Sequence, residues 1–385
     1  MSARESVAGA VELARTELVE LSHFIHAHPE MGYEEFQSAA AVADAAERAG
    51  FSVERGSAGL PTAFRATYGT GELHVVLCAE YDALPDIGHA CGHNIIATAS
   101  LGAAIGLASV ADALDLRVTL LGTPSEEGGG GKIDLLNAGY FRNEHMAMMV
   151  HPWPDDRLEA MCLAVDHFDV TFRGKDAHAS AAPWEGANAL DALTIAQVAI
   201  GLLRQQLRPG DQVHGIVTEG GSAANIIVSK AVGRFMCRSL TSERLAELRT
   251  RVNACFEAGA LATGTTYLIE ELGNAFSHME SDYEILAHYR SAAESLGRNF
   301  TLDDEGSAKP TISTDMANVS LAVATIHPLL AIPTGGAVNH QPEFTAACIS
   351  PDADQAIIDG ALALALTAVG VAEDLTLRER LVRKS

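Results

Sequence analysis

The sequence predicts an α/β protein in which a ferredoxin-like α+β domain is inserted into a larger sheet domain. Apolar strand-like runs alternate with helical segments before residue 164 and again after residue 279, which is typical of an α/β sheet. The elements between these parts follow the ferredoxin-like order β-α-β-β-α-β. The 385 residues are enough for two domains. We therefore expect residues 1–163 and 279–385 to form the larger domain and residues 164–278 to form the insertion.

The elements of the larger domain follow from the spacing of apolar residues. In the first helix Val11, Leu18 and Leu21 recur at roughly helical intervals, and the second helix ends at Gly50. Helices are predicted at 4–28, 35–49, 95–110 and 352–370, and strands at 62–68, 73–79, 116–122 and 146–150. In the insertion, strands are predicted at 167–173, 213–219, 231–238 and 265–271, and helices at 187–206 and 242–260.

Composition excludes some classes of partner. The net charge of −24 argues against binding to nucleic acid and to anionic membrane surfaces. The N-terminus lacks the apolar core of a signal peptide, and we expect no transmembrane helix, so a cytoplasmic location is predicted. The six cysteines are scattered, mostly in apolar runs, which suits reduced core thiols.

Candidate metal ligands follow the apolar strand at 73–79. Cys91 and His93 lie two residues apart on the next loop, and thiolate and imidazole are ligands for zinc and related divalent metals. A buried cysteine beside a capping histidine would give the same pattern. Asp82 could orient or bridge, although an aspartate before Ala-Leu-Pro is also typical of a turn.

A pair of acids follows the strand at 116–122. In an extended segment Glu126 and Glu127 would point in different directions, so one could bind metal while the other acts as a general base. A solvated helix N-terminus is the common alternative for such a pair. His151, at the end of another apolar strand, and His340, on a glycine-bearing loop, complete a set of ligand-type residues at strand ends.

The inserted domain holds three further candidates. His178 lies in the segment Gly-Lys-Asp-Ala-His-Ala, and Asn225 and Arg238 follow later in the same domain. Arg238 could pair with a substrate carboxylate, but an arginine on a strand face is commonly structural or solvated.

Residues 26–30, 80–94, 122–127 and 174–178, together with Asn225, resemble the metal-dependent amidohydrolase, aminoacylase and carboxypeptidase G family, in order and over almost the whole chain. The similarity is greatest to the branch of aminobenzoyl-glutamate hydrolases and β-alanyl dipeptidases. It implies a two-metal, exopeptidase-like catalytic domain with an inserted lid that mediates homodimers. It also implies two divalent metal ions per chain, zinc or manganese, with cobalt or nickel as alternatives.

The resemblance assigns expected roles residue by residue. Cys91, His93, Glu127, His151 and His340 match the metal ligands, and Glu126 matches the general base. His178 matches a lid histidine that polarises the scissile carbonyl across the dimer, while Asn225 and Arg238 match substrate-binding residues of the lid.

One motif departs from many relatives. Where they carry His-x-Asp, this chain has Glu80-Tyr81-Asp82. The Cys-Gly-His branch also lacks that histidine, and its ligand lies on the later loop. Asp82 is therefore expected to support a ligand.

The expected function is metal-dependent hydrolysis of an amide bond in an N-acyl amino acid or an unusual dipeptide, with Glu126 acting as base on metal-activated water. Three alternatives stay open. The chain could be an exo-dipeptidase acting on ordinary α-dipeptides, or a catalytically silent relative that binds a small ligand. A cysteine hydrolase using Cys91 and His93 is disfavoured, because residues two apart rarely reach nucleophile–base geometry.

Overall fold

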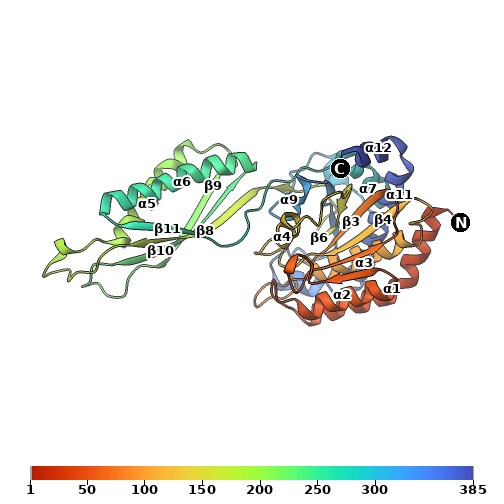
Figure 1. The fold of residues 1–385 in the computed structure, drawn as a ribbon, viewed down its shortest axis with the longest axis horizontal. Helices are drawn as coiled ribbons and strands as arrows, with labels where there is room; N and C mark the ends of the chain where they lie inside the picture. Colours follow the sequence, from red (N-terminus) through yellow and green to blue (C-terminus); the bar gives the residue numbers. More distant parts are fainter. Residues whose placement is uncertain (1, 385) are drawn as a thin grey trace. The chain divides into compact units, whose positions relative to one another are not determined.

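A computed structural model describes residues 2–384, which divide into two compact units. The first unit contains the chain up to Met161 and from Met279 onward, and the second runs from Cys162 to His278. Each unit is described by itself. The predicted α/β class with an inserted ferredoxin-like domain is confirmed (Figure 1).

The first unit is built on a six-stranded mixed sheet with the order β1-β2-β4-β3-β5-β13. Its strands are β1 Ser52–Arg55, β2 Phe64–Tyr68, β3 Leu73–Ala79, β4 Leu116–Gly122, β5 Met146–Met148 and β13 Ala324–Ile326. The last four positions in this order are occupied by parallel strands, with Ala79 opposite Gly122 and Leu77 opposite Met148. The short strands β6 His151–Trp153 and β14 Leu329–Ala331 pair separately in parallel.

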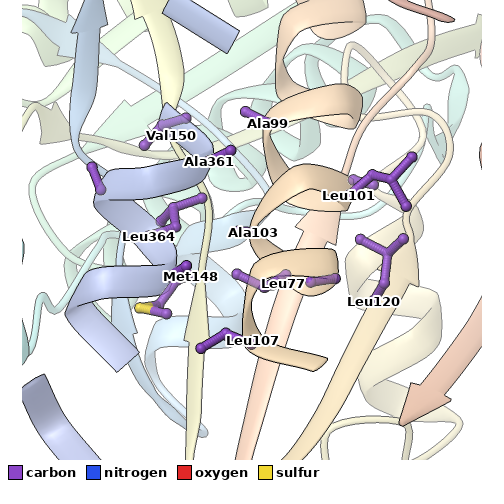
Figure 2. Packing of buried hydrophobic residues seen from close by; sticks show 14 of the residues in the cluster. Leu77, Ala99, Leu101, Ala103, Leu107, Leu120, Met148, Val150, Ala361 and Leu364 are labelled. Atoms are coloured by element: carbon purple, nitrogen blue, oxygen red, sulfur yellow. The ribbon is translucent and has the colours of Figure 1, made fainter. Parts of the chain in front are cut away.

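Helices α1 Ala3–Ala27, α3 His93–Ala108 and α11 Pro351–Glu373 pack against one another and bury the main core (Figure 2). A Cβ atom at Gly102 would lie 2.8 Å from both Leu18 and Ala361, so the lack of a side chain there permits the close approach of three helices. The remaining helices of this unit are α2 Phe36–Arg48, α4 Gly131–Asn137, α7 Tyr283–Ser295, α8 Thr301–Asp304, α9 Met316–Ser320, α10 Pro342–Ala347 and α12 Leu375–Lys384, with the 3-10 turn η1 Ser57–Gly59.

Helix α11 qualifies the expectation that no segment has the composition of a membrane span. By length and composition it could cross a membrane, and 83% of its most apolar window is buried inside the unit. Burial of that extent is typical of a core helix, which passes the same test.

The second unit is a four-stranded antiparallel sheet in the order β11-β8-β10-β9. Its elements are β8 Ala164–Arg173, η2 Pro183–Glu185, α5 Ala189–Leu203, η3 Arg204–Gln206, β9 Gln212–Glu219, β10 Lys230–Ser239, α6 Ser242–Thr263 and β11 Thr266–Glu271. Helices α5 and α6 cover one face of the sheet (Figure 1). Phe168, Phe235 and Phe256 fill the layer between them, because alternate residues of each strand face the helices.

Several elements differ from the prediction. The chain continues beyond α11 into α12, so the expected final helix is not the last one. The short strands β7 Met161–Cys162 and β12 Thr311–Ile312, as well as β1, β6, β13 and β14, were not predicted. Strands of two to four residues carry too few apolar positions for a period to show.

Candidate active site

The candidate site lies where three neighbouring parallel strands of the first unit end. Strands β3, β4 and β5 run in the same direction, so their carboxyl ends share one edge of the sheet. Open α/β sheets bind ligands at this edge. The segments that leave it carry Asp82, Cys91 and His93 after β3, Glu126 and Glu127 after β4, and His151 after β5.

A left-handed glycine sets the geometry of the Cys91 loop. Gly92 has a φ of +74°, and helix α3 begins at the next residue, His93. A Cβ atom at Gly92 would lie 2.8 Å from the ring of Pro152, so a larger residue does not fit. The tight turn buries the thiol of Cys91 and the imidazole of His93 together.

Asp82 fixes the tautomer of His93. Its Oδ1 lies 2.9 Å from His93 Nδ1, and its Oδ2 accepts a hydrogen bond from the backbone N–H of Glu127 at 3.0 Å. The carboxylate acceptor places a proton on Nδ1, which leaves Nε2 available as a ligand. Burial would raise the pKa of Asp82, but the charge of His93 lowers it below its usual value. The geometry thus makes Asp82 the orienting partner of His93.

Glu126 and Glu127 follow a turn. Ser125, immediately before them, has a φ of +56°, and residues 126–129 continue as a turn. Both carboxylates approach His93 Nε2, at 4.0 Å from Glu126 Oε2 and 3.9 Å from Glu127 Oε1. The expectation that the two acids point in different directions is wrong, because it assumed an extended backbone.

The two remaining predicted ligands join the same cluster. His151 Nδ1 lies 2.9 Å from the backbone oxygen of Pro152, so its proton is held on Nδ1 and Nε2 is available as a ligand. His340 is brought in by a hydrogen bond from its backbone N–H to the oxygen of Ala90, and its Nε2 lies 3.7 Å from Glu127 Oε2. His340 is more exposed than the other ligand residues, with its side chain 60% accessible.

The donor atoms form two triads that share one thiol. In the triad of Cys91, His93 and His151, and in that of Cys91, Glu127 and His340, the ligand atoms lie within 4.8 Å of one another. His93 Nε2 is buried and has no hydrogen-bond partner among the described residues. An orphaned imidazole nitrogen facing a thiol and carboxylates is what a metal ion would satisfy. The residues therefore fit two divalent cations, with Cys91 available to both.

The pKa values reflect the concentration of acids. Burial first, and then the charge of Glu80, raise the pKa of Glu126 well above its ordinary range. Burial and the charge of Glu127 do the same to the pKa of the Cys91 thiol. Burial would lower the pKa of His93, but its neighbouring carboxylates, Asp82 foremost, raise it well above the ordinary value. A cation at this position would relieve the repulsion that raises the pKa values of the acids and the thiol.

A buried ion triad beneath the site was not predicted. Lys132 Nζ lies 2.5 Å from Glu80 Oε1 and 2.7 Å from Asp315 Oδ1, and all three side chains are fully buried. Glu80 and Asp315 also lie close to Glu126. His327, another buried residue that was not predicted, has a ring centroid 5.6 Å from that of His151. The position of Glu80 beside the Asp82 motif was the available signal for it, but the sequence gives none for the pairing with Asp315.

The lid residues belong to the second unit. His178 Nδ1 accepts hydrogen bonds from the backbone N–H groups of Ser180 at 3.3 Å and Ala181 at 3.2 Å, so its proton is carried on Nε2. Asn225 lies beside it, because its backbone oxygen accepts a hydrogen bond from Ala179 N at 3.0 Å. Arg238 lies on β10 opposite Val165, and burial lowers the pKa of its guanidinium.

Comparison with known proteins fits this geometry. Residues 165–263 match the model of the peptidase dimerisation domain of the M20 peptidases. The chain is 37% identical to the Xaa-Arg dipeptidase of Mus musculus over 96% of its own length and 88% of that protein. The chain belongs to the M20 peptidase family. A second relative, from the p-aminobenzoyl-glutamate hydrolase of Escherichia coli, is 32% identical over 67% of this chain and 58% of its own length.

Solved structures support the M20 fold over nearly the whole chain. A Bacillus subtilis protein described as a dinuclear metal-binding peptidase of the M20 family has a TM-score of 0.72 at 19% identity, covering 94% of this chain and 100% of that one. An aminohydrolase from methicillin-resistant Staphylococcus aureus has a TM-score of 0.79 at 18% identity, over 95% and 99% of the two chains.

Proposed function

We propose that this M20 protein hydrolyses the amide bond of dipeptides or N-acyl amino acids with the help of divalent metal ions. The observation that carries the proposal is the pair of ligand triads sharing Cys91 at the carboxyl edge of the sheet, with Glu126 beside them. The relatives support the substrate class, since they include an Xaa-Arg dipeptidase, an aminobenzoyl-glutamate hydrolase and an N-acetyl-L-cysteine deacetylase. The protein is a hydrolase of C–N bonds.

The metal ions would be held by Cys91, His93 and His151 on one side and by Cys91, Glu127 and His340 on the other. Bound there, they supply Lewis-acid charge and lower the pKa of water. We propose zinc or manganese, with cobalt or nickel as alternatives, because the donor set mixes a thiol and imidazoles with a carboxylate.

Glu126 acts as the general base. It is 7% exposed, and its carboxylate lies at the edge of the cluster, 4.0 Å from His93 Nε2. Its role is to take a proton from the attacking water and to pass that proton to the leaving amine nitrogen. The raised pKa of the carboxyl, caused by burial and by Glu80, suits a group that must release the proton again near neutral pH.

His178 donates to the scissile carbonyl. Its Nδ1 accepts backbone hydrogen bonds, so Nε2 carries a proton without the ring being charged. A donor of this kind stabilises the negative charge that develops on the carbonyl oxygen. Asn225, which lies next to His178, and Arg238 are the proposed contacts for the substrate's polar groups.

The second unit also carries the features of a dimer contact, and we propose a homodimer through it. Ile195, Val198 and Leu202 lie three and four residues apart on α5 and are 37%, 60% and 60% exposed. Strand β9 is an open edge of the sheet. An apolar helix stripe and an open strand edge are surfaces that a second copy covers. The free cysteines support the proposed cytoplasmic location.

A mass-spectrometric amine-release assay tests the function. Metal-loaded protein is incubated with Xaa-Arg and Xaa-Lys dipeptides, β-alanyl dipeptides, aminobenzoyl-glutamate and N-acyl amino acids. The proposal predicts cleavage of at least one class, abolished by a chelator and restored by metal. Cleavage confined to ordinary α-dipeptides would favour the exo-dipeptidase alternative. Two bound metals without cleavage of any class would favour a silent relative.

A further inference from the structure

The backbone immediately before the general base is in a conformation that its residue type disfavours. Ser125 has a φ of +56°, in the left-handed region that residues other than glycine rarely adopt. This strain persists only where the surroundings hold it. Because Ser125 lies between β4 and the two acids, its conformation sets the direction in which the chain presents Glu126 and Glu127.

Glu35 holds Ser125 from a distant part of the chain. Its carboxylate Oε1 accepts a hydrogen bond from Ser125 N at 2.7 Å, and the Glu35 side chain is fully buried. The backbone oxygen of Ser125 accepts hydrogen bonds from Gly130 N at 2.8 Å and Gly129 N at 3.1 Å. Both backbone groups of Ser125 are therefore fixed, one of them by a side chain 90 residues earlier.

The side chain of Ser125 is enclosed as well. A Cβ atom at Gly32 would lie 2.3 Å from Ser125 Oγ, and a Cβ atom at Gly129 would lie 2.4 Å from it. Gly129 also packs against the ring of Tyr33, where an added Cβ would lie 2.2 Å away. The segment that carries Glu35 thus closes around Ser125 and leaves it no room to relax.

Glu126 lies between two backbone amides that donate to buried carboxylates. Glu35 accepts from Ser125 N, and Asp82 accepts from Glu127 N. We infer that Glu35 is a positioning residue that holds Ser125 in its left-handed conformation and so aims Glu126 and Glu127 at the metal cluster. Its effect on turnover rests on the proposed function, whereas its effect on metal affinity through Glu127 does not.

The test compares Glu35→Ala in the wild-type and in the Ser125→Gly background. Glycine adopts a positive φ freely, so it removes much of the need for Glu35. We expect Glu35→Ala to lower kcat and the affinity for Co²⁺ by about 10–100-fold, the range seen when the hydrogen-bond support of a metal ligand is removed. In the Ser125→Gly background the same substitution should cost at least tenfold less. Glu35→Gln, which keeps an acceptor oxygen, should recover most of the loss.

Glu30→Ala is the matched control. Glu30 also accepts backbone hydrogen bonds, from Gln37 and Ser38 at the start of α2, but it does not contact Ser125. It should lower stability without changing kcat or Co²⁺ affinity. Equal losses for Glu35→Ala in both backgrounds, or a loss matched by Glu30→Ala, would overturn the inference.

Two further results keep the test decisive. If Glu35→Ala does not fold, Glu35→Gln and Glu35→Met are compared instead, since Met fills similar space without an acceptor, and equal kcat and Co²⁺ affinity for the two would overturn the inference. If the wild type cleaves no amide, the proposed function fails, and Co²⁺ affinity alone then decides the role of Glu35.

Discussion

Replacing Asp82 by Asn should weaken metal binding through a residue that is not itself a predicted ligand. Asp82 is buried and uses both oxygens, one toward His93 Nδ1 at 2.9 Å and one to accept from Glu127 N at 3.0 Å. An Asn side chain offers one acceptor oxygen, and its NH₂ group would face a donor at the other position. Either His93 loses its orienting acceptor or the backbone of Glu127 does.

The size of the effect follows from this loss. Removing the partner that orients a metal-binding histidine typically costs about 10–100-fold in metal affinity, which corresponds to about 1.4–2.7 kcal/mol. The loss of the negative charge acts in the same direction, because Asp82 is the strongest of the charges that raise the pKa of His93. A less basic imidazole is a weaker ligand.

The assay is a competition titration of Co²⁺ or Zn²⁺ against a chromophoric chelator at fixed pH. Glu144→Gln is the control, since Glu144 is also a buried acid of the first unit but is paired with Arg117 and contacts no predicted ligand. Asp82→Asn should raise the Kd by at least tenfold, while the control leaves it unchanged. A Kd within twofold of wild type for Asp82→Asn would refute the orienting role.

Three further outcomes are expected. Lys132→Met should lower the free energy of unfolding by about 3–5 kcal/mol in urea titrations, because it leaves Glu80 and Asp315 buried without a counter-ion; a loss below 1 kcal/mol would contradict this. Removing metal should lower the Tm, since metal at a hundred times its Kd adds about 2.7 kcal/mol of stability; equal Tm values would exclude specific binding. Burial, then His74 and Arg117, lower the pKa of His145 to about 4. The folded protein therefore binds fewer protons there, and stability falls as pH drops from 6.5 toward 4; His145→Asn should reduce that slope, and an unchanged slope would exclude His145 as its source.

The sequence predicted the parts of the site that lie next to a strand. The apolar runs of β3 and β4 mark strands by length and composition, and the ligand-type residues follow them directly, so that Cys91, His93 and Glu127 could be placed at one edge. The ferredoxin-like insertion was predictable for a similar reason, because its six elements have strong periodicity and a recognisable order.

The supporting layer could not be predicted, because its pairs join distant parts of the chain. Lys132 and Asp315 are 183 residues apart, and Glu35 and Ser125 are 90 residues apart. Apolar periodicity carries no information about which buried acid meets which amide. The left-handed backbone of Ser125 was also unexpected for a serine, and it is the reason why the predicted directions of the two acids were wrong.

The ratio of bound metal to turnover in Glu126→Gln tests the central claim most directly. The variant and wild type are loaded with the same metal, their metal content is measured by mass spectrometry, and kcat is measured on a substrate that the wild type cleaves. The account predicts two metal ions per chain in both proteins and a kcat about 10²–10⁴-fold lower in the variant, the usual contribution of a general base. Near-full turnover with both metals bound would contradict the assignment of Glu126 as the base.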